Sequence, residues 1–347
     1  MKRLLLVGYY GFDNLGDELV LLSTLEFIKA HYPFIEPVVL YNKDIDKIYG
    51  ADVIPRKNLV SGISRIDGIC FAGGSILQDV TSLNSLLYYL GIILFSSLLK
   101  KPVIMISQGI GPINTFIGEK LMKLINLVYS LSLRDIGSKE LLMKLGVNKP
   151  LMYVGSDLAL FYNPGKVEIS DNLEDKILVS VRPFPGFDED VMISALKEAK
   201  ERYSVNLCFL VSHKEEDLDI SKRFTQKTGG DIFFWDNIED VINSISSSKL
   251  VLGVRLHPLI LSALLEVPFI GIAYDPKVRA FLSLFPKMQL LELTGEEEDI
   301  ESAIISSLED REILKSHIKD VKEKLLEKEQ ETFRPIDELY NLWYKDR

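Results

Sequence analysis

Residues 3–31 read RLLLV, GYYGFDNLGD and ELVLLSTLEFIKAH in succession: an apolar run, a glycine-rich turn and a segment with helical periodicity. The run Arg3–Val7 is nearly all apolar, which is typical of a parallel strand covered on both faces. The apolar stretch is too short for a signal peptide and runs directly into Gly8, so we interpret it as a first strand. The following segment, Glu18–His31, predicts a helix. Strand, tight turn and helix form the repeating unit of α/β folds.

The same alternation continues along the chain. Strands are predicted at Arg3–Val7, Glu36–Leu40, Gly68–Ala72, Val103–Ser107, Leu131–Arg134, Met152–Gly155, Ile177–Arg182, Asn206–Val211, Asp231–Phe234, Leu250–Val254, Phe269–Ala273 and Gln289–Leu293. Helical patterns lie between them, for example at Glu18–His31, Gly118–Tyr129 and Asp188–Tyr203. This order predicts an α/β protein with two Rossmann-like, doubly wound domains. Ligands of such sheets bind at the carboxyl ends of the strands, so we expect the two domains to face a common cleft.

The domain boundaries follow from breaks in this pattern. The segment Tyr162–Asp175 lacks periodicity and contains Pro, Gly, Asn and Asp, which makes it the best linker candidate. We therefore predict an N-terminal domain at residues 1–165 and a C-terminal domain at 176–310. Residues 311–347 are predicted to form helices that pack back on the domains, with an apolar stripe of Phe333, Leu339, Trp343 and Tyr344 docking the tail.

Composition limits the class of protein. The 347 residues are 47% hydrophobic and 26% charged, which is ordinary for a globular protein, and the net charge is −10. A general nucleic-acid binder would need a broad basic face, so nucleic acid is not an expected partner. An anionic ligand would instead be held by a few placed Lys and Arg side chains. Cys70 and Cys208 lie in apolar runs and are expected to be reduced core residues of a cytoplasmic protein.

The longest apolar segment is Ser85–Leu98, which is followed by Leu99 and then by two lysines. It falls short of the roughly 20 residues that a membrane-spanning helix needs. We predict a buried helix here, and contact with a membrane surface is the alternative.

Two glycine-rich motifs follow predicted strands in the first half. The stretch GYYGFDNLGDE (residues 8–18) offers Asn14 and Asp17 near a helix start, but it fits neither GxGxxG nor GxxxxGK, so no dinucleotide or Walker-type site is indicated. The alternative is a capped strand-to-helix turn. The stretch AGGSILQD (residues 72–79) lets the backbone of Gly73 and Gly74 approach a ligand, and Gln78 and Asp79 could orient a hydroxyl. Here the alternative is that Asp79 caps the next helix.

Two arginines stand at the ends of predicted strands. Arg134, in LSLRD, has a guanidinium fork suited to a carboxylate or phosphate, with a structural Arg134–Asp135 pair as the alternative. Arg182, in SVRP, is left near the same edge because Pro183 ends the strand, with a solvated side chain as the alternative. The turn SQGIGP at residues 107–112 is weak evidence by itself and is interpreted as scaffold.

The most specific motif is GVRLHPLI at residues 253–260. Arg255 and His257 are two residues apart, so in extended backbone they would project to the same side. An imidazole can exchange a proton near neutral pH while the guanidinium holds an oxyanion. The alternative for His257 is a structural role. Lys277, in YDPK after the neighbouring predicted strand, adds a cation, unless that motif is only a turn.

Other chemistries are poorly supported by the sequence. Its four histidines (His31, His213, His257 and His317) lack metal-ligand spacing, so no metal site is predicted. A GxSxG nucleophile elbow is also missing. His213 follows a predicted strand but ranks below His257 as a candidate.

In this order the motifs resemble the polysaccharide pyruvyltransferase family, in particular its CsaB-type members. The matching stretches lie in residues 1–284 and are GYYGFDNLGDE, FAGGSILQDVTS, SQGIGPI, LSLRD, GSDLAL, SVRPF, GVRLHPLI and YDPKV. Together they are specific, although each alone is not. The resemblance implies a GT-B-like fold and transfer of pyruvate from phosphoenolpyruvate to a sugar diol, which forms a cyclic ketal and releases phosphate. It also implies an acceptor with β-linked N-acetylmannosamine from a cell-wall polysaccharide, lipid-linked or soluble, handled at the inner face of the membrane.

The resemblance also suggests roles for residues. It maps the family's basic and histidine positions to Arg134, His257 and Lys277, with Arg255 in the same motif as His257. We expect the N-terminal domain to hold the acceptor and the C-terminal domain the donor, with no further cofactor. His257 is the hypothesised proton donor, and Asp79 would orient or deprotonate an acceptor hydroxyl. The substrate-binding candidates are Arg134, Arg255, Lys277, Arg182, Asn14, Asp17, Gly73, Gly74 and Gln78.

Two other functions remain open at this level. A nucleotide-sugar glycosyltransferase of the same architecture would use the cations for a diphosphate. A carbohydrate-binding protein without activity would keep the fold but not the Arg-x-His and Asp-Pro-Lys motifs. Binding of phosphoenolpyruvate, and not of a UDP-sugar, would separate the pyruvyltransferase from the glycosyltransferase. Phosphate release with a sugar that can be pyruvylated would separate it from the inactive carbohydrate-binding protein.

Overall fold

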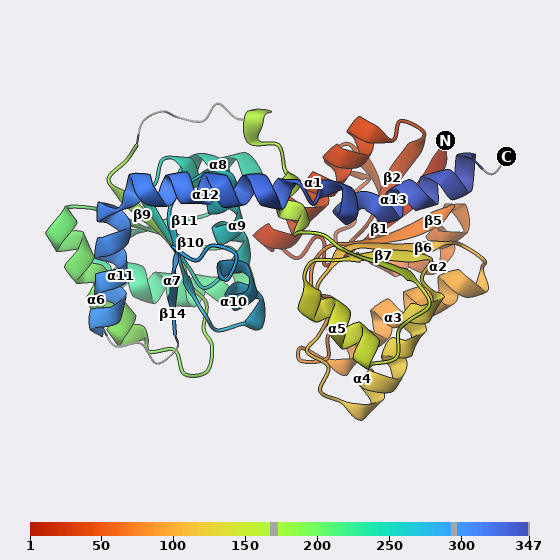
Figure 1. Ribbon diagram of the computed structural model, residues 1–347, viewed down its shortest axis with the longest axis horizontal. Helices are drawn as coiled ribbons and strands as arrows, with labels where there is room; N and C mark the ends of the chain where they lie inside the picture. The colour runs from red at the N-terminus through yellow and green to blue at the C-terminus, as the bar shows by residue number, and fades with distance from the viewer. Residues whose placement is uncertain (167–172, 293–296, 346–347) are drawn as a thin grey trace. The chain divides into compact units, whose positions relative to one another are not determined.

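The structure is a computed structural model that describes residues 1–166, 173–292 and 297–345. It divides into two compact units, each built on one sheet (Figure 1). Unit 1 comprises Met1–Phe12, Asp17–Tyr162 and the chain from Leu325 onward. Unit 2 comprises Asp13–Gly16 and Asn163–Lys324. These divisions differ from the predicted ranges in three places: Asp13–Gly16 and Asn163–Gly165 group with unit 2, and the tail is divided between the units at Leu325.

Unit 1 contains an eight-stranded sheet in the order β3-β4-β2-β1-β5-β6-β7-β8. The strands are β1 (Lys2–Val7), β2 (Ile35–Tyr41), β3 (Lys47–Ile48), β4 (Ala51–Pro55), β5 (Gly68–Ala72), β6 (Val103–Gln108), β7 (Ser130–Leu133) and β8 (Leu151–Val154). All neighbouring pairs are parallel except β3 and β4. The chain reverses direction across the sheet beside β1, so the strand order is doubly wound.

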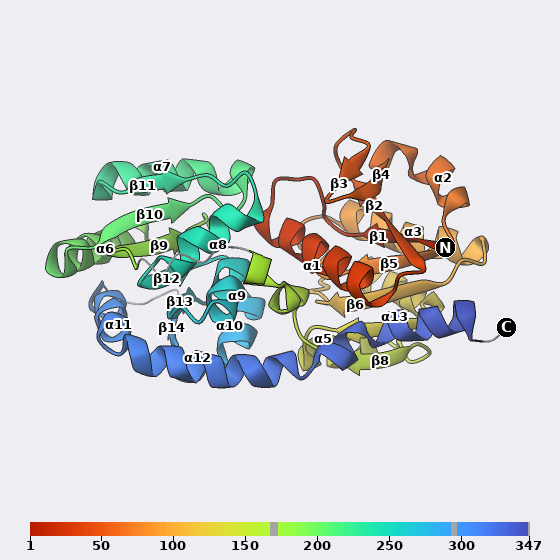
Figure 2. The ribbon, with the colours of Figure 1, turned by 90° about the horizontal axis from the view of Figure 1, so that it is seen from above.

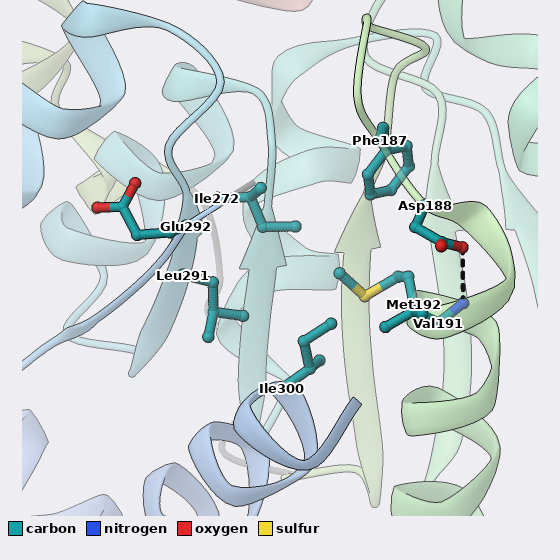
Figure 3. A pocket seen from close by; sticks show the side chains of 8 residues that line it. All are labelled: Phe187, Asp188, Val191, Met192, Ile272, Leu291, Glu292 and Ile300. Atoms are coloured by element: carbon teal, nitrogen blue, oxygen red, sulfur yellow. Dashed lines mark hydrogen bonds between the residues drawn. The ribbon is translucent and has the colours of Figure 1, made fainter. Parts of the chain in front are cut away.

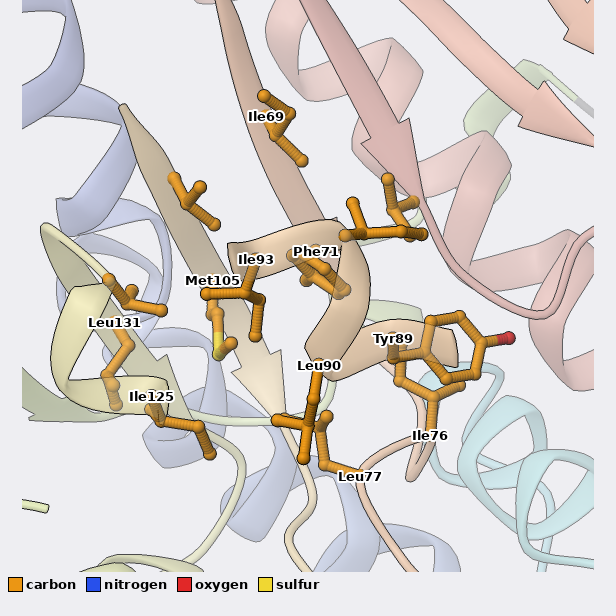
Figure 4. Packing of buried hydrophobic residues seen from close by; sticks show 14 of the residues in the cluster. Ile69, Phe71, Ile76, Leu77, Tyr89, Leu90, Ile93, Met105, Ile125 and Leu131 are labelled. Atoms are coloured by element: carbon orange, nitrogen blue, oxygen red, sulfur yellow. The ribbon is translucent and has the colours of Figure 1, made fainter. Parts of the chain in front are cut away.

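Side chains of β1 alternate between the two faces of this sheet. Leu5 and Val7 join a core with α3 (Leu83–Leu98), and Figure 4 shows side chains of α3 reaching the strands. Leu4 and Leu6 join the core on the opposite face, with α1 (Leu15–His31) and α13 (Glu329–Tyr344). Helix α13 packs against β6, β7 and β8 (Figure 2). Because both faces are covered, the parallel strands are apolar on both sides.

The remaining helices of unit 1 are short. They are α2 (Leu59–Gly62), α4 (Phe116–Leu121) and α5 (Ile136–Lys144), with 3₁₀ turns at Arg56–Asn58, Ile63–Arg65, Met122–Leu127 and Leu158–Phe161. The C-terminal stripe lies on this unit: Phe333, Leu339 and Trp343 are buried in its core, and Phe333 stacks on Phe27 with ring centroids 3.4 Å apart.

Unit 2 contains a six-stranded parallel sheet in the order β11-β10-β9-β12-β13-β14. Its strands are β9 (Lys176–Ser180), β10 (Asn206–Leu210), β11 (Asp231–Phe233), β12 (Leu250–Gly253), β13 (Phe269–Ile272) and β14 (Gln289–Leu291). Its helices are α6 (Glu189–Tyr203), α7 (Lys214–Thr228), α8 (Ile238–Ser246), α9 (Leu256–Leu264), α10 (Pro276–Leu282), α11 (Glu297–Glu309) and α12 (Arg311–Leu326). This is again a doubly wound α/β arrangement.

A small cavity lies inside unit 2 (Figure 3). Its walls are apolar side chains such as Met192 and Ile300, with the carboxylates of Asp188 and Glu292 at its edge. The volume is about 20 Å³, which is enough for about one water molecule. None of the predicted site residues lines it, and Asp188 is occupied in capping α6. It is therefore not the candidate site.

The predicted strands are all present, with ends that shift by one or two residues. Two short strands were missed, β3 and β4, because they lie at the half-exposed edge of the sheet and lack a long apolar run. The predicted helix at Gly118–Tyr129 was only partly right: α4 gives way to a 3₁₀ turn that ends at Leu127. Leu293 of the last predicted strand, and residues 167–172 of the predicted linker, lie outside the described residues.

The prediction that Ser85–Leu98 is a buried helix was half wrong. The helix forms, but one side of it is exposed. Within the described residues, no helix is both long and apolar enough to cross a bilayer.

Candidate functional site

The glycine turn after β5 has a fixed shape. Gly73 and Gly74 have φ angles of 64° and 76°, the left-handed region that favours glycine. A Cβ at Gly73 would lie 2.5 Å from Val20, so the position has no room for a side chain. The Gln108 side chain donates to the Gly73 carbonyl at 2.6 Å, and the Gly109 amide donates to the Gly74 carbonyl at 2.9 Å. The turn is thus held in place from β6.

Arg134 follows β7 and reaches this turn. Its Nη2 donates to Ser75 Oγ at 3.1 Å, and its Nη1 lies 3.4 Å from Asp157 Oδ2. The guanidinium rests on Gly109, where a Cβ would lie 2.6 Å from Nη2. Arg134 and Asp157 are both largely buried, so the cation is desolvated and fixed beside the glycine turn.

The alternative Arg134–Asp135 pair is the weaker contact, because Arg134 Nε and Asp135 Oδ2 are 3.7 Å apart. Asp135 instead caps α5 by accepting from the Ser138 amide at 2.7 Å. The partners of Arg134 that the residue analysis did not single out are Ser75 and Asp157. The available signal was the GSDLAL stretch, which contains Asp157.

Asp17 also lies beside this turn, since its Oδ1 is 3.4 Å from the position that a Gly74 Cβ would occupy. Gln78 does not join the cluster through any hydrogen bond described here: its amide group bonds Thr81 three residues on, and the Gln78 Oε1 accepts from the Thr81 amide at 2.9 Å. Unit 1 therefore brings together Asp17, Gly73, Gly74 and Arg134 from the predicted set.

Asp79 is buried and its carboxylate holds a loop. It accepts hydrogen bonds from the amides of Asn114 and Thr115, each at 2.8 Å, and from the Thr115 hydroxyl at 2.6 Å. Burial raises the pKa of Asp79, but the bonds from Thr115 and Asn114 outweigh burial and lower the pKa below its usual value. This geometry favours a role in positioning the loop before α4. The proposed base role would require the carboxylate to give up these donors.

In unit 2, Arg255 is fixed by a buried carboxylate. Its Nε lies 3.2 Å from both oxygens of Asp217, which is fully buried, and its Nη2 lies 2.6 Å from Glu216 Oε2. Asp217 also accepts from the His213 amide at 2.9 Å. Burial alone would lower the pKa of Arg255, but Asp217 and then Glu216 raise it, so the guanidinium stays charged.

Arg182 also contacts Glu216. Its Nη2 is 3.0 Å from Glu216 Oε2, and its Nη1 donates to the Tyr274 hydroxyl at 3.0 Å. The guanidinium lies over the Tyr274 ring, 5.1 Å from the centroid. Burial raises the pKa of Glu216, but Arg255 and Arg182 lower it by more. Arg182 is therefore not a solvated side chain, and its buried Nε has no hydrogen-bond partner within the described part of the chain.

The extended-backbone argument for Arg255 and His257 was wrong. Strand β12 ends at Gly253, and α9 begins at Leu256, so Arg255 is the residue before the helix and His257 lies in its first turn. Two residues apart in a helix do not share a face. His257 is instead positioned by packing: a Cβ on Gly16 would lie 2.0 Å from His257 Nδ1. The imidazole therefore rests directly on the Gly16 backbone.

The segment Asp13–Gly16, which leads into α1, bonds the rest of unit 2 through its backbone. Asn14 pairs with His213 in a β-bridge, and the Leu15 amide donates to the Ser212 carbonyl at 2.9 Å. The Asn14 side chain accepts from the Gly16 amide at 3.0 Å. Asn14 thus supports the surface on which His257 rests, and it does not belong with the glycine turn of unit 1.

Lys277 follows the strand next to β12, in the first turn of α10. Its Nζ lies 3.3 Å from Asp275 Oδ2, while Asp275 Oδ1 caps the helix by accepting the Lys277 amide at 2.9 Å. Lys277 is half-exposed, and within the described residues it forms no hydrogen bond or ion pair with Arg255 or His257.

The sequence analysis did not single out Glu216 and Asp217 of unit 2, and it ranked His213 below His257. Glu216 and Asp217 organise both arginines, and the signal for them is the acidic first turn of the helix after β10. His213 is buried, and its Nδ1 has no hydrogen-bond partner among the described residues. Unit 2 therefore brings together Arg182 and Arg255, with His257 two residues after Arg255.

Residues 14–276 match the sequence model of the family described as polysaccharide pyruvyl transferase. The chain belongs to this family. That stretch contains the glycine turn, Arg134, the Glu216 arginine pair and His257. The resemblance seen in the motifs is therefore confirmed at the level of the family. A search of curated protein sequences finds no significant match to the chain.

Solved structures show the fold of this pyruvyl transferase family member. The S. aureus MnaA–UDP co-structure has a TM-score of 0.64 at 12% identity, covering 99% of this chain and 97% of that chain. UDP-GlcNAc 2-epimerase from Neisseria meningitidis bound to UDP-GlcNAc has a TM-score of 0.62 at 15% identity, covering 94% and 99%. At such identities the likeness shows the fold alone, which is the GT-B type with two parallel-sheet domains.

Proposed function

We propose that the protein transfers pyruvate from phosphoenolpyruvate to two hydroxyls of a sugar in a cell-wall polysaccharide precursor, releasing phosphate. Family membership supports the pyruvyl transfer. The observation that carries the choice of donor is the pair of guanidiniums, Arg182 and Arg255, arranged around one carboxylate oxygen of Glu216. Phosphoenolpyruvate carries a carboxylate and a phosphate, and guanidinium forks bind both groups.

Glu216 is the residue that would make way for this donor. Its side chain is 44% exposed and can swing outward, whereas Asp217 is fully buried and keeps Arg255 in place. A substrate carboxylate or phosphate could then replace the Glu216 carboxylate between the two arginines. Lys277 would add a cation from the next strand.

The reaction requires a proton at C3 of the enol, which leaves C2 electrophilic. One sugar hydroxyl then forms a bond to C2, and a second hydroxyl closes the ketal as the C2–O bond to phosphate breaks. The proton given to C3 is replaced by one from the attacking hydroxyls, and the other hydroxyl proton leaves with the phosphate. We assign the proton transfer to His257, because imidazole exchanges protons near neutral pH.

In unit 1, the glycine turn and Arg134 are the proposed acceptor site. The Gly73 amide and carbonyl are already bonded to Ile106 and Gln108, so Gly73 would shape this site, and Gly74 and Asp17 are the groups of the turn that would bond a sugar hydroxyl. We further propose a CsaB-type acceptor, a β-linked N-acetylmannosamine. Asp79 would support this site by holding the loop before α4.

Binding measurements test the donor. We expect phosphoenolpyruvate to bind in isothermal titration and UDP-N-acetylglucosamine not to bind. The second ligand is included because solved structures with the same fold are complexes with UDP and with UDP-GlcNAc. Phosphate release in the presence of both phosphoenolpyruvate and an N-acetylmannosaminyl acceptor would then establish turnover. Tight binding of UDP-N-acetylglucosamine with no response to phosphoenolpyruvate would overturn the proposal.

A further inference from the structure

The outward face of α3 is apolar beyond Asn84, the polar residue at its N-terminal end. Exposed positions fall at Asn84, Leu87, Gly91, Leu94 and Leu98, the spacing of three and four that marks one side of a helix. Leu98 is 72% exposed. Helix α3 contains no charged residue, although a surface helix of a globular protein ordinarily carries charged and polar residues outward.

The opposite face of α3 is fixed in the core of unit 1. Tyr89, Leu90 and Ile93 are buried and point toward the sheet, as Figure 4 shows. The helix cannot leave this core without losing that packing, and it is too short to span a bilayer. A hydrophobic partner that covers the outer face of α3 must therefore bind at the protein surface while α3 stays in place.

Further exposed apolar side chains lie near the N-terminal end of α3, where α4 contacts it. Val80 is next to Asp79, and Phe116 and Ile117 are next to Thr115, which Asp79 binds through both its amide and its hydroxyl. Phe116 is 69% exposed and Ile117 is 54% exposed. We call the outer side of α3 together with Val80, Phe116 and Ile117 the α3 face.

Lysines flank the α3 face at both ends. Lys100 and Lys101 follow the C-terminal end of α3, and the Lys101 ammonium donates to the carbonyls of Ser64 and Ile66. Lys120 and Lys123 lie just after Phe116 and Ile117. The Lys120 ammonium lies 4.1 Å from the centroid of the Phe116 ring. Residues 80–130 contain four lysines and one glutamate, whereas the whole chain has a net charge of −10. The face is thus apolar and locally positive on an acidic protein.

We propose that the α3 face docks on an anionic lipid bilayer, with α3 lying in the plane of the interface. Apolar residues flanked by lysines match acyl chains bordered by anionic headgroups. A second copy of this chain fits less well. In either a parallel or an antiparallel two-fold contact between α3 helices, the flanking lysines would meet lysines. The proposal goes beyond the transfer reaction and does not depend on it.

Gly91 provides a matched pair of test variants. It is exposed at the middle of the α3 face, and a Cβ there would meet no atom within 4 Å. Gly91→Leu and Gly91→Glu should therefore both fold, and both residues favour a helix over glycine. Sedimentation with vesicles of phosphatidylcholine, alone or mixed with phosphatidylglycerol, measures the binding of each variant.

We expect the wild type to sediment with the mixed vesicles and much less with phosphatidylcholine alone. Gly91→Leu should strengthen the binding about tenfold, because it adds one leucine side chain to the apolar contact. Gly91→Glu should weaken the binding at least about tenfold, because it places a charge in that contact. Lys100→Gln with Lys123→Gln should weaken binding to the mixed vesicles only.

The control is Leu342→Glu on α13, another helix of unit 1. Leu342 is 40% exposed, as is Leu94 on the α3 face, and its substitution should leave vesicle binding unchanged. The proposal fails if the wild type does not sediment with the mixed vesicles, or if Gly91→Leu and Gly91→Glu bind them equally. It also fails if the protein is a dimer that both Gly91 variants dissociate, since the α3 face would then be covered by a second copy.

Discussion

Arg182 and Arg255 share a single acceptor atom, Glu216 Oε2, which lies 3.0 Å from one guanidinium and 2.6 Å from the other. The two arginines follow neighbouring strands of the unit 2 sheet, β9 and β12. Two guanidiniums this close would repel each other without a negative charge between them. Glu216 supplies this charge in the structure, and Asp217 supplies a second one to Arg255.

Glu216→Gln should tighten the binding of phosphoenolpyruvate. The substitution removes the carboxylate that competes with the substrate, and because this pair is partly exposed we expect a gain of about two- to fivefold. Isothermal titration at fixed salt concentration measures the change. Asp217→Asn is the matched comparison: it should weaken binding, because Arg255 loses its buried partner. Weaker binding in Glu216→Gln would show that Glu216 positions the arginines and does not stand in for substrate.

His257→Ala should abolish turnover while leaving the fold intact. Loss of a general acid typically lowers the rate about 10²- to 10⁴-fold, and phosphate release from phosphoenolpyruvate plus acceptor reports it. His31→Ala, at an exposed histidine on α1, is the control and should keep wild-type activity. Phosphate release at the wild-type rate from His257→Ala would remove His257 from the mechanism.

Gly16→Ala should lower turnover through His257. The added Cβ would lie 2.0 Å from His257 Nδ1, so the imidazole must move. We expect kcat to fall at least about tenfold, since displacement of a reacting group by about 1 Å is costly. Gly137→Ala is the control, because the nearest atom to its Cβ is at 3.4 Å. If Gly16→Ala changed the melting temperature but not kcat, the contact would be purely structural.

Asp79→Asn should destabilise the protein in a pH-dependent way. The folded-state pKa of Asp79 is lowered, so its carboxylate stabilises the fold above the unfolded pKa of about 4 and loses that effect as the pH falls through the folded value. At pH 7 we expect the substitution to lower the free energy of unfolding by about 1–3 kcal/mol. Denaturant titrations between pH 7 and about pH 3 should show the difference from wild type shrinking. If the difference in free energy of unfolding between wild type and Asp79→Asn stayed constant across this range, the lowered pKa of Asp79 would be contradicted.

The strands could be predicted from sequence because parallel strands covered on both faces are apolar runs, and the glycine turns follow them. Gly73 and Gly74 were found in this way. The pairing of Arg255 with Asp217 could not be predicted, since the two lie 38 residues apart and meet only because β10 and β12 flank β9 in the sheet. Residues close in sequence were also misjudged: the Arg255–His257 argument assumed extended backbone where a helix begins.

Sequence alone thus determined the α/β class, the family and most candidate residues, because local apolar periodicity and short motifs survive in the linear order. The tertiary structure decided what each residue does. Asp79 became the anchor of a loop, Asn14 a support for the surface beneath His257, and α3 a helix with one exposed apolar side. Hydrogen-bond partners and burial depend on which distant segments meet, and that is a property of strand order and packing rather than of any local pattern.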